Sequence, residues 1–231
     1  MNITFYGDSL TEGTPGVPFL RTLKPMLPED VLTNLGRGGD TVISLYRRMV
    51  QEPVPAPMDV AVLWIGVNDV LASLSWSHSA LKQVLHQPPA RDRTEFGDYY
   101  QRTIAHLRRD ARHVIALSPF LIGEDLTNPW NRQLDALRKV ASSVAASFGN
   151  VDYVDLREQL APLLKGRQVS AYVPRHVTVI ALDALFLRAA HRVDRVAARR
   201  GLHLTLDGVH LNSAGAQAVA AELQRSLRSL P

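Results

Sequence analysis

Cysteine is absent from this sequence of 231 residues, and its absence excludes three kinds of chemistry. The chain can form no disulfide bond, no thiolate metal site and no cysteine nucleophile. The sequence also contains no run of eighteen apolar residues and no basic N-terminal segment followed by an apolar one. We therefore expect neither a membrane span nor a secretory leader, and we expect a cytoplasmic protein.

The sequence has little net charge and no internal repeat or low-complexity tract. Its 26 lysines and arginines stand against 22 acidic residues, a formal charge of +4, and the basic residues are scattered. Scattered positive charge disfavours nucleic acid as a partner. A hydrophobic content of 46% is typical of a soluble globular protein, and the length predicts a single domain over residues 1–231.

Short strand patterns alternate with amphipathic helix patterns along the chain. Strands are predicted at residues 2–6, 31–34, 59–65, 114–117 and 151–155, and helices at residues 17–26, 41–51, 96–110, 129–148, 156–164, 182–200 and 213–230. This alternation predicts an α/β fold in which helices cover both faces of a parallel sheet. Residues 70–93 fit one or two short helices, and residues 165–179 fit no regular element.

A turn that contains Gly7, Asp8 and Ser9 follows the first predicted strand. Glycine permits a sharp turn, and a serine at the carboxyl end of a strand lies where ligands bind in open α/β sheets. This position suits a nucleophile whose product is an oxyanion. The alternative is a turn serine that caps a helix.

Gly39 and Asn68 follow the second and third predicted strands in the same way. The Gly39 backbone N–H, the Asn68 amide and the Ser9 N–H would together form a three-donor oxyanion hole. The alternatives are a plain loop at Gly38-Gly39 and a turn at Asn68-Asp69.

Asp207 and His210 lie three residues apart, just before the last predicted helix. At this spacing the Asp207 carboxylate can accept a hydrogen bond from Nδ1–H of His210 and leave Nε2 free to take the Ser9 proton. We interpret the other seven histidines as surface or packing residues.

Four short motifs therefore occur in order along the chain: Gly7-Asp8-Ser9-Leu10, Gly39 before Asp40-Thr41, Gly66-Val67-Asn68-Asp69, and Asp207-Gly208-Val209-His210. With these motifs the chain resembles the SGNH, or GDSL, hydrolases over residues 7–210. Gly36 and Gly38 are the alternatives to Gly39 in the second motif. The resemblance implies a flavodoxin-like three-layer α/β/α fold with a five-stranded parallel sheet in the order 2-1-3-4-5. It also marks residues 70–93 and 165–200 as insertions.

The resemblance further implies hydrolysis of carboxylic or thioester bonds without a metal ion or cofactor. Ser9 is then the nucleophile, His210 the general base and Asp207 its orienter, and Ser9, Gly39 and Asn68 form the oxyanion hole. We expect a small or medium acyl ester as the small-molecule substrate, with a carbohydrate O-acetylesterase or an acyl thioesterase as alternatives. The non-enzyme alternative is a flavodoxin-like small-molecule-binding protein with a phosphate loop at residues 7–13, which gives Asp207 and His210 no role.

Residues 70–93 carry more apolar side chains than a solvated loop. Because this segment begins directly after Asn68, we expect Leu71 and Trp76 to wall the acyl pocket. The alternative is a helical insertion packed on the edge of the domain.

Two further patterns have simple structural explanations. The proline-rich residues 52–57 favour a stiff connector over a polyproline ligand. Arg188, Arg192, Arg195 and Arg199 share one helix face, which is typical of a solvated surface and less so of a patch for an acidic substrate.

Overall fold

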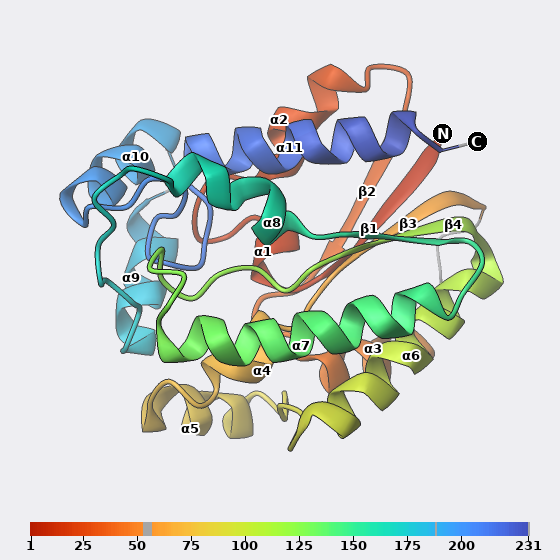
Figure 1. Cartoon of the computed structure of the whole chain (residues 1–231), viewed down its shortest axis with the longest axis horizontal. Coiled ribbons are helices and arrows are strands. Elements are labelled where there is room, and N and C mark those ends of the chain that lie inside the picture. The colour runs from red at the N-terminus through yellow and green to blue at the C-terminus, as the bar shows by residue number, and fades with distance from the viewer. Residues whose placement is uncertain (53–56, 188, 231) are drawn as a thin grey trace.

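The computed structural model of this protein describes residues 1–52, 57–187 and 189–230. Its sheet consists of β1 (Asn2–Gly7), β2 (Val31–Gly36), β3 (Met58–Trp64), β4 (Ala111–Leu117) and β5 (Val151–Val154). All neighbouring strands are parallel, and their order is β2-β1-β3-β4-β5 (Figure 1). The predicted α/β fold class and strand order are therefore confirmed.

The first three strands end at the same level of the sheet. Gly7 of β1 lies opposite both Gly36 of β2 and Trp64 of β3. The residues that follow these strands therefore emerge side by side at one edge of the sheet. Because β1 and β3 are central and almost fully buried, that edge rests on a rigid support.

Helices cover both faces of the sheet. The helices α2 (Phe19–Leu23), α8 (Leu156–Leu160) and α11 (Ser213–Arg228) lie on one side, and α3 (Val42–Gln51), α6 (Arg93–Asp110) and α7 (Pro129–Ala146) on the other (Figure 1). Their apolar faces pack on the sheet, and Phe19, Phe96 and Tyr100 are among the largest fully buried side chains. This is the three-layer arrangement that the alternating sequence pattern predicts.

The remaining α-helices of the described residues follow strand ends or lie in the insertions. They are α1 (Ser9–Glu12), α4 (Val67–Leu71), α5 (Trp76–Val84), α9 (Val177–Phe186) and α10 (Ala190–Arg199). Two predicted helices also end earlier than expected, because 3-10 turns that contain a proline follow them at Lys24–Met26 and Ala161–Leu164.

The prediction of one continuous helix over residues 182–200 is wrong. The chain leaves the helical path after Phe186, and a second helix begins at Ala190. Leu182, Leu185 and Phe186 are 55–61% exposed, whereas Val193 is fully buried, so the apolar positions of this stretch do not form one buried face.

The arginine face and the proline-rich connector fall partly outside the described residues. Arg192, Arg195 and Arg199 are exposed, which agrees with a solvated surface. Arg188 and residues 53–56 lie outside the described ranges.

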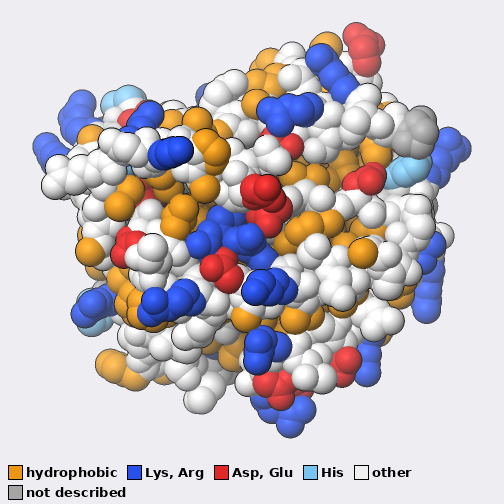
Figure 2. Space-filling model, in the orientation of Figure 1, with side chains coloured by type: hydrophobic (Ala, Val, Ile, Leu, Met, Phe, Trp, Pro, Cys, Tyr) orange, Lys and Arg blue, Asp and Glu red, His pale blue; other side chains and the backbone are white. Residues whose placement is uncertain are grey.

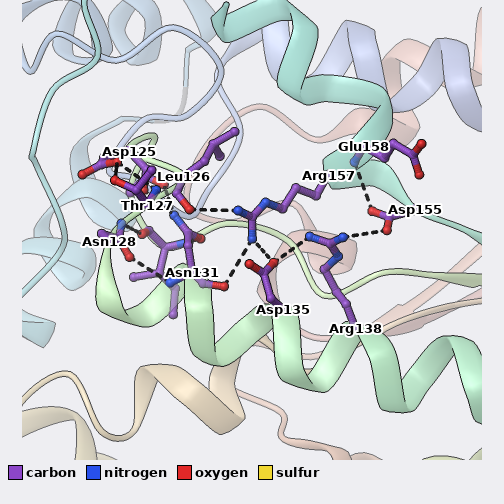
Figure 3. A network of polar contacts seen from close by, with 12 residues as sticks. Asp125, Leu126, Thr127, Asn128, Asn131, Asp135, Arg138, Asp155, Arg157 and Glu158 are labelled. Atoms are coloured by element: carbon purple, nitrogen blue, oxygen red, sulfur yellow. Dashed lines mark hydrogen bonds and ion pairs between the residues drawn. The ribbon is translucent and has the colours of Figure 1, made fainter.

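A polar network ties the loop after β4 to α7 and α8 (Figure 3). Arg157 donates to the Leu126 carbonyl at 2.8 Å and pairs with Asp135, which also binds Arg138 at 2.7 Å. The Asn131 amide donates to the carbonyl oxygen of Gly123 at 3.0 Å, so the loop is held from two sides. Figure 2, in the orientation of Figure 1, shows positive and negative side chains interspersed over this face of the molecule.

Candidate active site

The turn after β1 brings Ser9 to the edge of the sheet. A Cβ atom on Gly7 would lie 2.2 Å from the Trp64 carbonyl oxygen, so only glycine lets this turn pass so close to β3. The Asp8 carboxylate accepts a hydrogen bond from the Leu10 N–H at 2.9 Å and caps α1. The helix cap is therefore Asp8, and the Ser9 hydroxyl is available for other contacts.

Ser9, His210 and Asp207 form a continuous hydrogen-bonded chain. Ser9 Oγ lies 2.9 Å from His210 Nε2, and His210 Nδ1 lies 2.8 Å from Asp207 Oδ2. The other Asp207 oxygen accepts the backbone N–H groups of Val209 at 3.0 Å and His210 at 2.9 Å. Asp207 is therefore held rigidly, and the histidine is oriented with one ring nitrogen towards the serine.

The electrostatics of this pair favour a charged imidazolium. Burial alone lowers the pKa of His210, but the adjacent Asp207 carboxylate outweighs it and raises the pKa above its usual 6.5. Burial raises the pKa of Asp207 in turn, yet the charge and hydrogen bond of His210 bring it below 3.8. A proton taken up by His210 is thus stabilised by Asp207.

Glu124 supports the loop that carries Asp207, a role that sequence reasoning missed. It is 1% exposed, and its carboxylate accepts the backbone N–H groups of His203, Leu204 and Thr205 at 2.7–2.8 Å. The Gly123 N–H also donates to the Gly208 carbonyl at 2.7 Å. Glu124 lies in the segment that follows β4, at the carboxyl edge of the sheet. An acidic residue in such a segment was the sequence signal that could have indicated its role.

Three potential hydrogen-bond donors surround the serine. Nδ2 of Asn68 is buried and has no hydrogen-bond partner among the described residues. Gly39 adopts a φ of +81°, and Gly39, Asn68 and Ser9 line one cavity. The N–H of Ser9, the first residue of α1, has no acceptor within the helix.

The cavity at Ser9 has a volume of about 290 Å³ and is walled largely by α5 and α9. Leu71, Leu81 and Leu85 contribute apolar surface to this cavity, as do Val177 and Ile180 of α9. Leu71 lines this cavity, and its place in an acyl pocket stays a prediction. Trp76, at the start of α5, is 81% exposed and is not among the residues that line the cavity.

The model of the GDSL-like Lipase/Acylhydrolase family matches residues 5–218, which include all four motifs. This chain belongs to that family. It is therefore an ester-cleaving hydrolase, and the resemblance noted from the motifs is confirmed. A search among curated proteins found no match.

Several solved structures share the fold of this GDSL-family protein. The acetyl xylan esterase AlAXEase is 23% identical with a TM-score of 0.67, over 98% of this chain and 100% of its own. Axe2 from Geobacillus stearothermophilus, also an acetylxylan esterase, is 19% identical with a TM-score of 0.67, over 100% and 94%. A lipolytic G-D-S-L family member from Veillonella parvula is 17% identical with a TM-score of 0.63, over 100% of both chains.

The described residues contain neither a membrane-spanning helix nor a cluster of metal ligands. No helix within these ranges has the length and apolar character needed to cross a membrane. In the same part of the chain, no three His, Asp or Glu side chains are grouped so that they could hold a metal ion.

Buried charges surround the GDSL serine. Burial raises the pKa of Asp8 to about 7 and that of Asp69 to about 6, and it lowers the pKa of Lys82 to about 8. Sequence reasoning missed Lys82 and also Gln87, which lies against Gly39. Both belong to the segment 70–93, in which only the apolar residues stood out.

Proposed function

We propose that this protein is a serine carboxylesterase that cleaves small or medium acyl esters through an acyl-enzyme on Ser9. The observation that carries the proposal is the hydrogen-bonded chain from Ser9 through His210 to Asp207, whose serine end lines an apolar cavity. The catalytic mutants of Axe2, in which a serine, an aspartate or a histidine is replaced by alanine, support it by analogy.

In the proposed mechanism, Ser9 Oγ attacks the ester carbonyl carbon as its proton passes to His210 Nε2. The carbonyl oxygen becomes an oxyanion and accepts hydrogen bonds from the Ser9 N–H, the Gly39 N–H and the Asn68 amide. His210 then gives its proton to the departing alkoxide, and the acyl group stays on Ser9. Water, deprotonated by the same histidine, hydrolyses this intermediate and restores the serine.

The lining of the cavity supports an acyl substrate. Side chains of α5 and α9 supply most of its apolar surface, while Glu12 and Gly38 lie on the side of the turns after β1 and β2. An acyl chain placed against these apolar side chains would gain about 0.8 kcal/mol of transfer free energy for each methylene group that it buries.

We expect kcat/KM for aryl esters to rise about fourfold for each added methylene until the cavity is filled. The measurement compares acetyl to octanoyl esters with acetylated xylo-oligosaccharides and acyl-coenzyme A thioesters under the same conditions. A higher kcat/KM for the acetylated sugars than for every aryl ester would favour a carbohydrate O-acetylesterase. The structural similarity to acetyl xylan esterases supports this alternative. A preference for the thioesters would favour an acyl thioesterase, and hydrolysis of none would contradict the proposal.

The pH dependence should report the neutral form of His210. Because its pKa is raised above 6.5, kcat/KM should rise with pH through an apparent pKa above that value and be lost as the pH falls below it. The measurement is the pH–rate profile with an activated aryl ester, between about pH 5 and 9.

Asp8 requires a control in this experiment, since its pKa of about 7 lies in the same range. Asp8→Asn retains a side-chain oxygen for the Leu10 N–H and should keep the acid limb of the profile, moved to lower pH because the Asp8 charge also raises the pKa of His210. A limb that disappears in Asp8→Asn would assign the titration to Asp8 and not to His210.

A further inference from the structure

Lys82 is a buried cation that lines the cavity but has no place in the mechanism above. It projects from α5, is 5% exposed, and donates a hydrogen bond from Nζ to Asn68 Oδ1 at 2.9 Å. The same ammonium group donates to the carbonyl oxygen of Gly39. One side chain from the segment 70–93 therefore binds two of the three residues assigned to the oxyanion hole.

Nearby carboxylates offset part of the effect of burial on this ammonium group. Asp8, Asp40 and Asp69 all act on Lys82 as opposite charges, and they reach it from three different segments of the chain. Asp69 is itself fixed, because its two oxygens accept the N–H groups of Val42 and Ala90 at 3.0 Å. Lys82 thus lines the cavity with carboxylates around it, which define its position.

The contact with Lys82 decides which end of the Asn68 amide is free. An ammonium group only donates, so the amide oxygen must face it and Nδ2 is left without a partner among the described residues. A hydrogen bond to a charged donor also polarises the amide, which makes Nδ2–H a stronger donor to a developing oxyanion. The arrangement therefore sets both the orientation and the strength of this donor.

The Gly39 N–H is fixed by the neighbouring peptide group. That N–H shares its peptide plane with the Gly38 carbonyl, which accepts a hydrogen bond from Gln87 Nε2 at 3.0 Å. A Cβ atom on Gly39 would lie 2.4 Å from Gln87 Oε1, so the glycine is needed for this close packing. Lys82 holds the next peptide plane through the Gly39 carbonyl. Two polar side chains of the insertion thus hold consecutive peptide groups of the turn after β2.

We propose that Lys82 is a positioning residue for the oxyanion hole, holding the Asn68 amide and the Gly39 turn so that their donors face the carbonyl oxygen of the substrate. The proposal rests on the proposed function, because it assigns Lys82 a role in the stabilisation of the ester transition state. The Lys82 ammonium group donates to Asn68 and Gly39, and its role is exerted through these two residues.

The test is a double-mutant cycle with Lys82→Met and Asn68→Ala, measured as kcat and KM with an aryl ester. Asn68→Ala should lower kcat by about 10²–10³ with little change in KM, because the bond strengthens only as charge develops. Lys82→Met should lower kcat by about ten- to hundredfold in the parent protein, but by no more than about threefold once Asn68 is gone.

Gln83→Met is the matched control. Gln83 is an exposed neighbour on the same helix, so this variant should keep kcat and KM within about twofold of the parent. Equal losses from Lys82→Met in both backgrounds, an unchanged kcat, or a rise in KM alone would overturn the positioning role.

Thermal unfolding of each variant separates this role from a general loss of structure. If Lys82→Met does not fold, Lys82→Gln takes its place in the cycle, since it keeps a polar side chain without the charge. Failure of both to fold would assign Lys82 to folding and overturn the proposal. Retained activity in Ser9→Ala would instead overturn the proposed function, whatever the cycle with Lys82 shows.

Discussion

Replacement of Ser9 by alanine is expected to lower kcat/KM for an aryl ester by about 10⁴-fold or more, since no other group near His210 Nε2 would carry the acyl intermediate. The fold should survive. The Ser9 side chain makes one hydrogen bond among the described residues, to His210, and the cap of α1 is provided by Asp8. Loss of one such bond typically changes the free energy of unfolding by about 1 kcal/mol.

The measurement combines steady-state rates, thermal unfolding and fluorophosphonate labelling read out by mass spectrometry. The adduct should lie on Ser9 in the parent protein and be absent from Ser9→Ala. Ser73→Ala is the matched control: this exposed serine donates only to the Val70 carbonyl, so its loss should change neither rate nor labelling. An adduct on another serine, together with an active Ser9→Ala, would contradict the assignment.

The contacts that sequence reasoning anticipated depend on local spacing or on strand ends. The spacing of Asp207 and His210 allows a contact wherever the loop lies, and the structure has that contact at 2.8 Å. Ser9 and His210 are 201 residues apart in the sequence. They meet because Ser9 follows the first strand and His210 lies in the loop before the last helix, and both positions are at the carboxyl edge of the parallel sheet. The alternation of elements predicted that the strands are parallel, and the resemblance to the SGNH hydrolases predicted their order.

The residues that sequence reasoning missed depend on how the insertions dock. Lys82 stands in a helix with ordinary polar and apolar spacing, and only the position of α5 against Asn68 and Gly39 buries its charge. Trp76 is the opposite case, because the largest side chain of that segment faces solvent. Docking of a short helix is decided by tertiary packing, which the period of its sequence does not specify.

Asp207→Asn should lower kcat by about 10⁴-fold while leaving the loop and Ser9 in place. In the parent, one Asp207 oxygen accepts two backbone N–H groups and the other faces His210 Nδ1. The asparagine oxygen must keep the two backbone donors, so the new NH₂ group faces Nδ1. The imidazole then takes the tautomer with its proton on Nε2, which points a donor at Ser9 and removes the base.

Loss of the Asp207 charge should also move the acid limb of the pH profile to lower pH. That charge offsets the burial that lowers the pKa of His210, so the pKa falls when the carboxylate is gone. Kinetics from about pH 5 to 9, with slow but detectable fluorophosphonate labelling of Ser9, would separate this outcome from unfolding. Asp194→Asn is the control, since Asp194 binds Ser213 beside the same loop and makes no contact with His210. A kcat within about tenfold of the parent would mean that His210 is oriented by something other than Asp207.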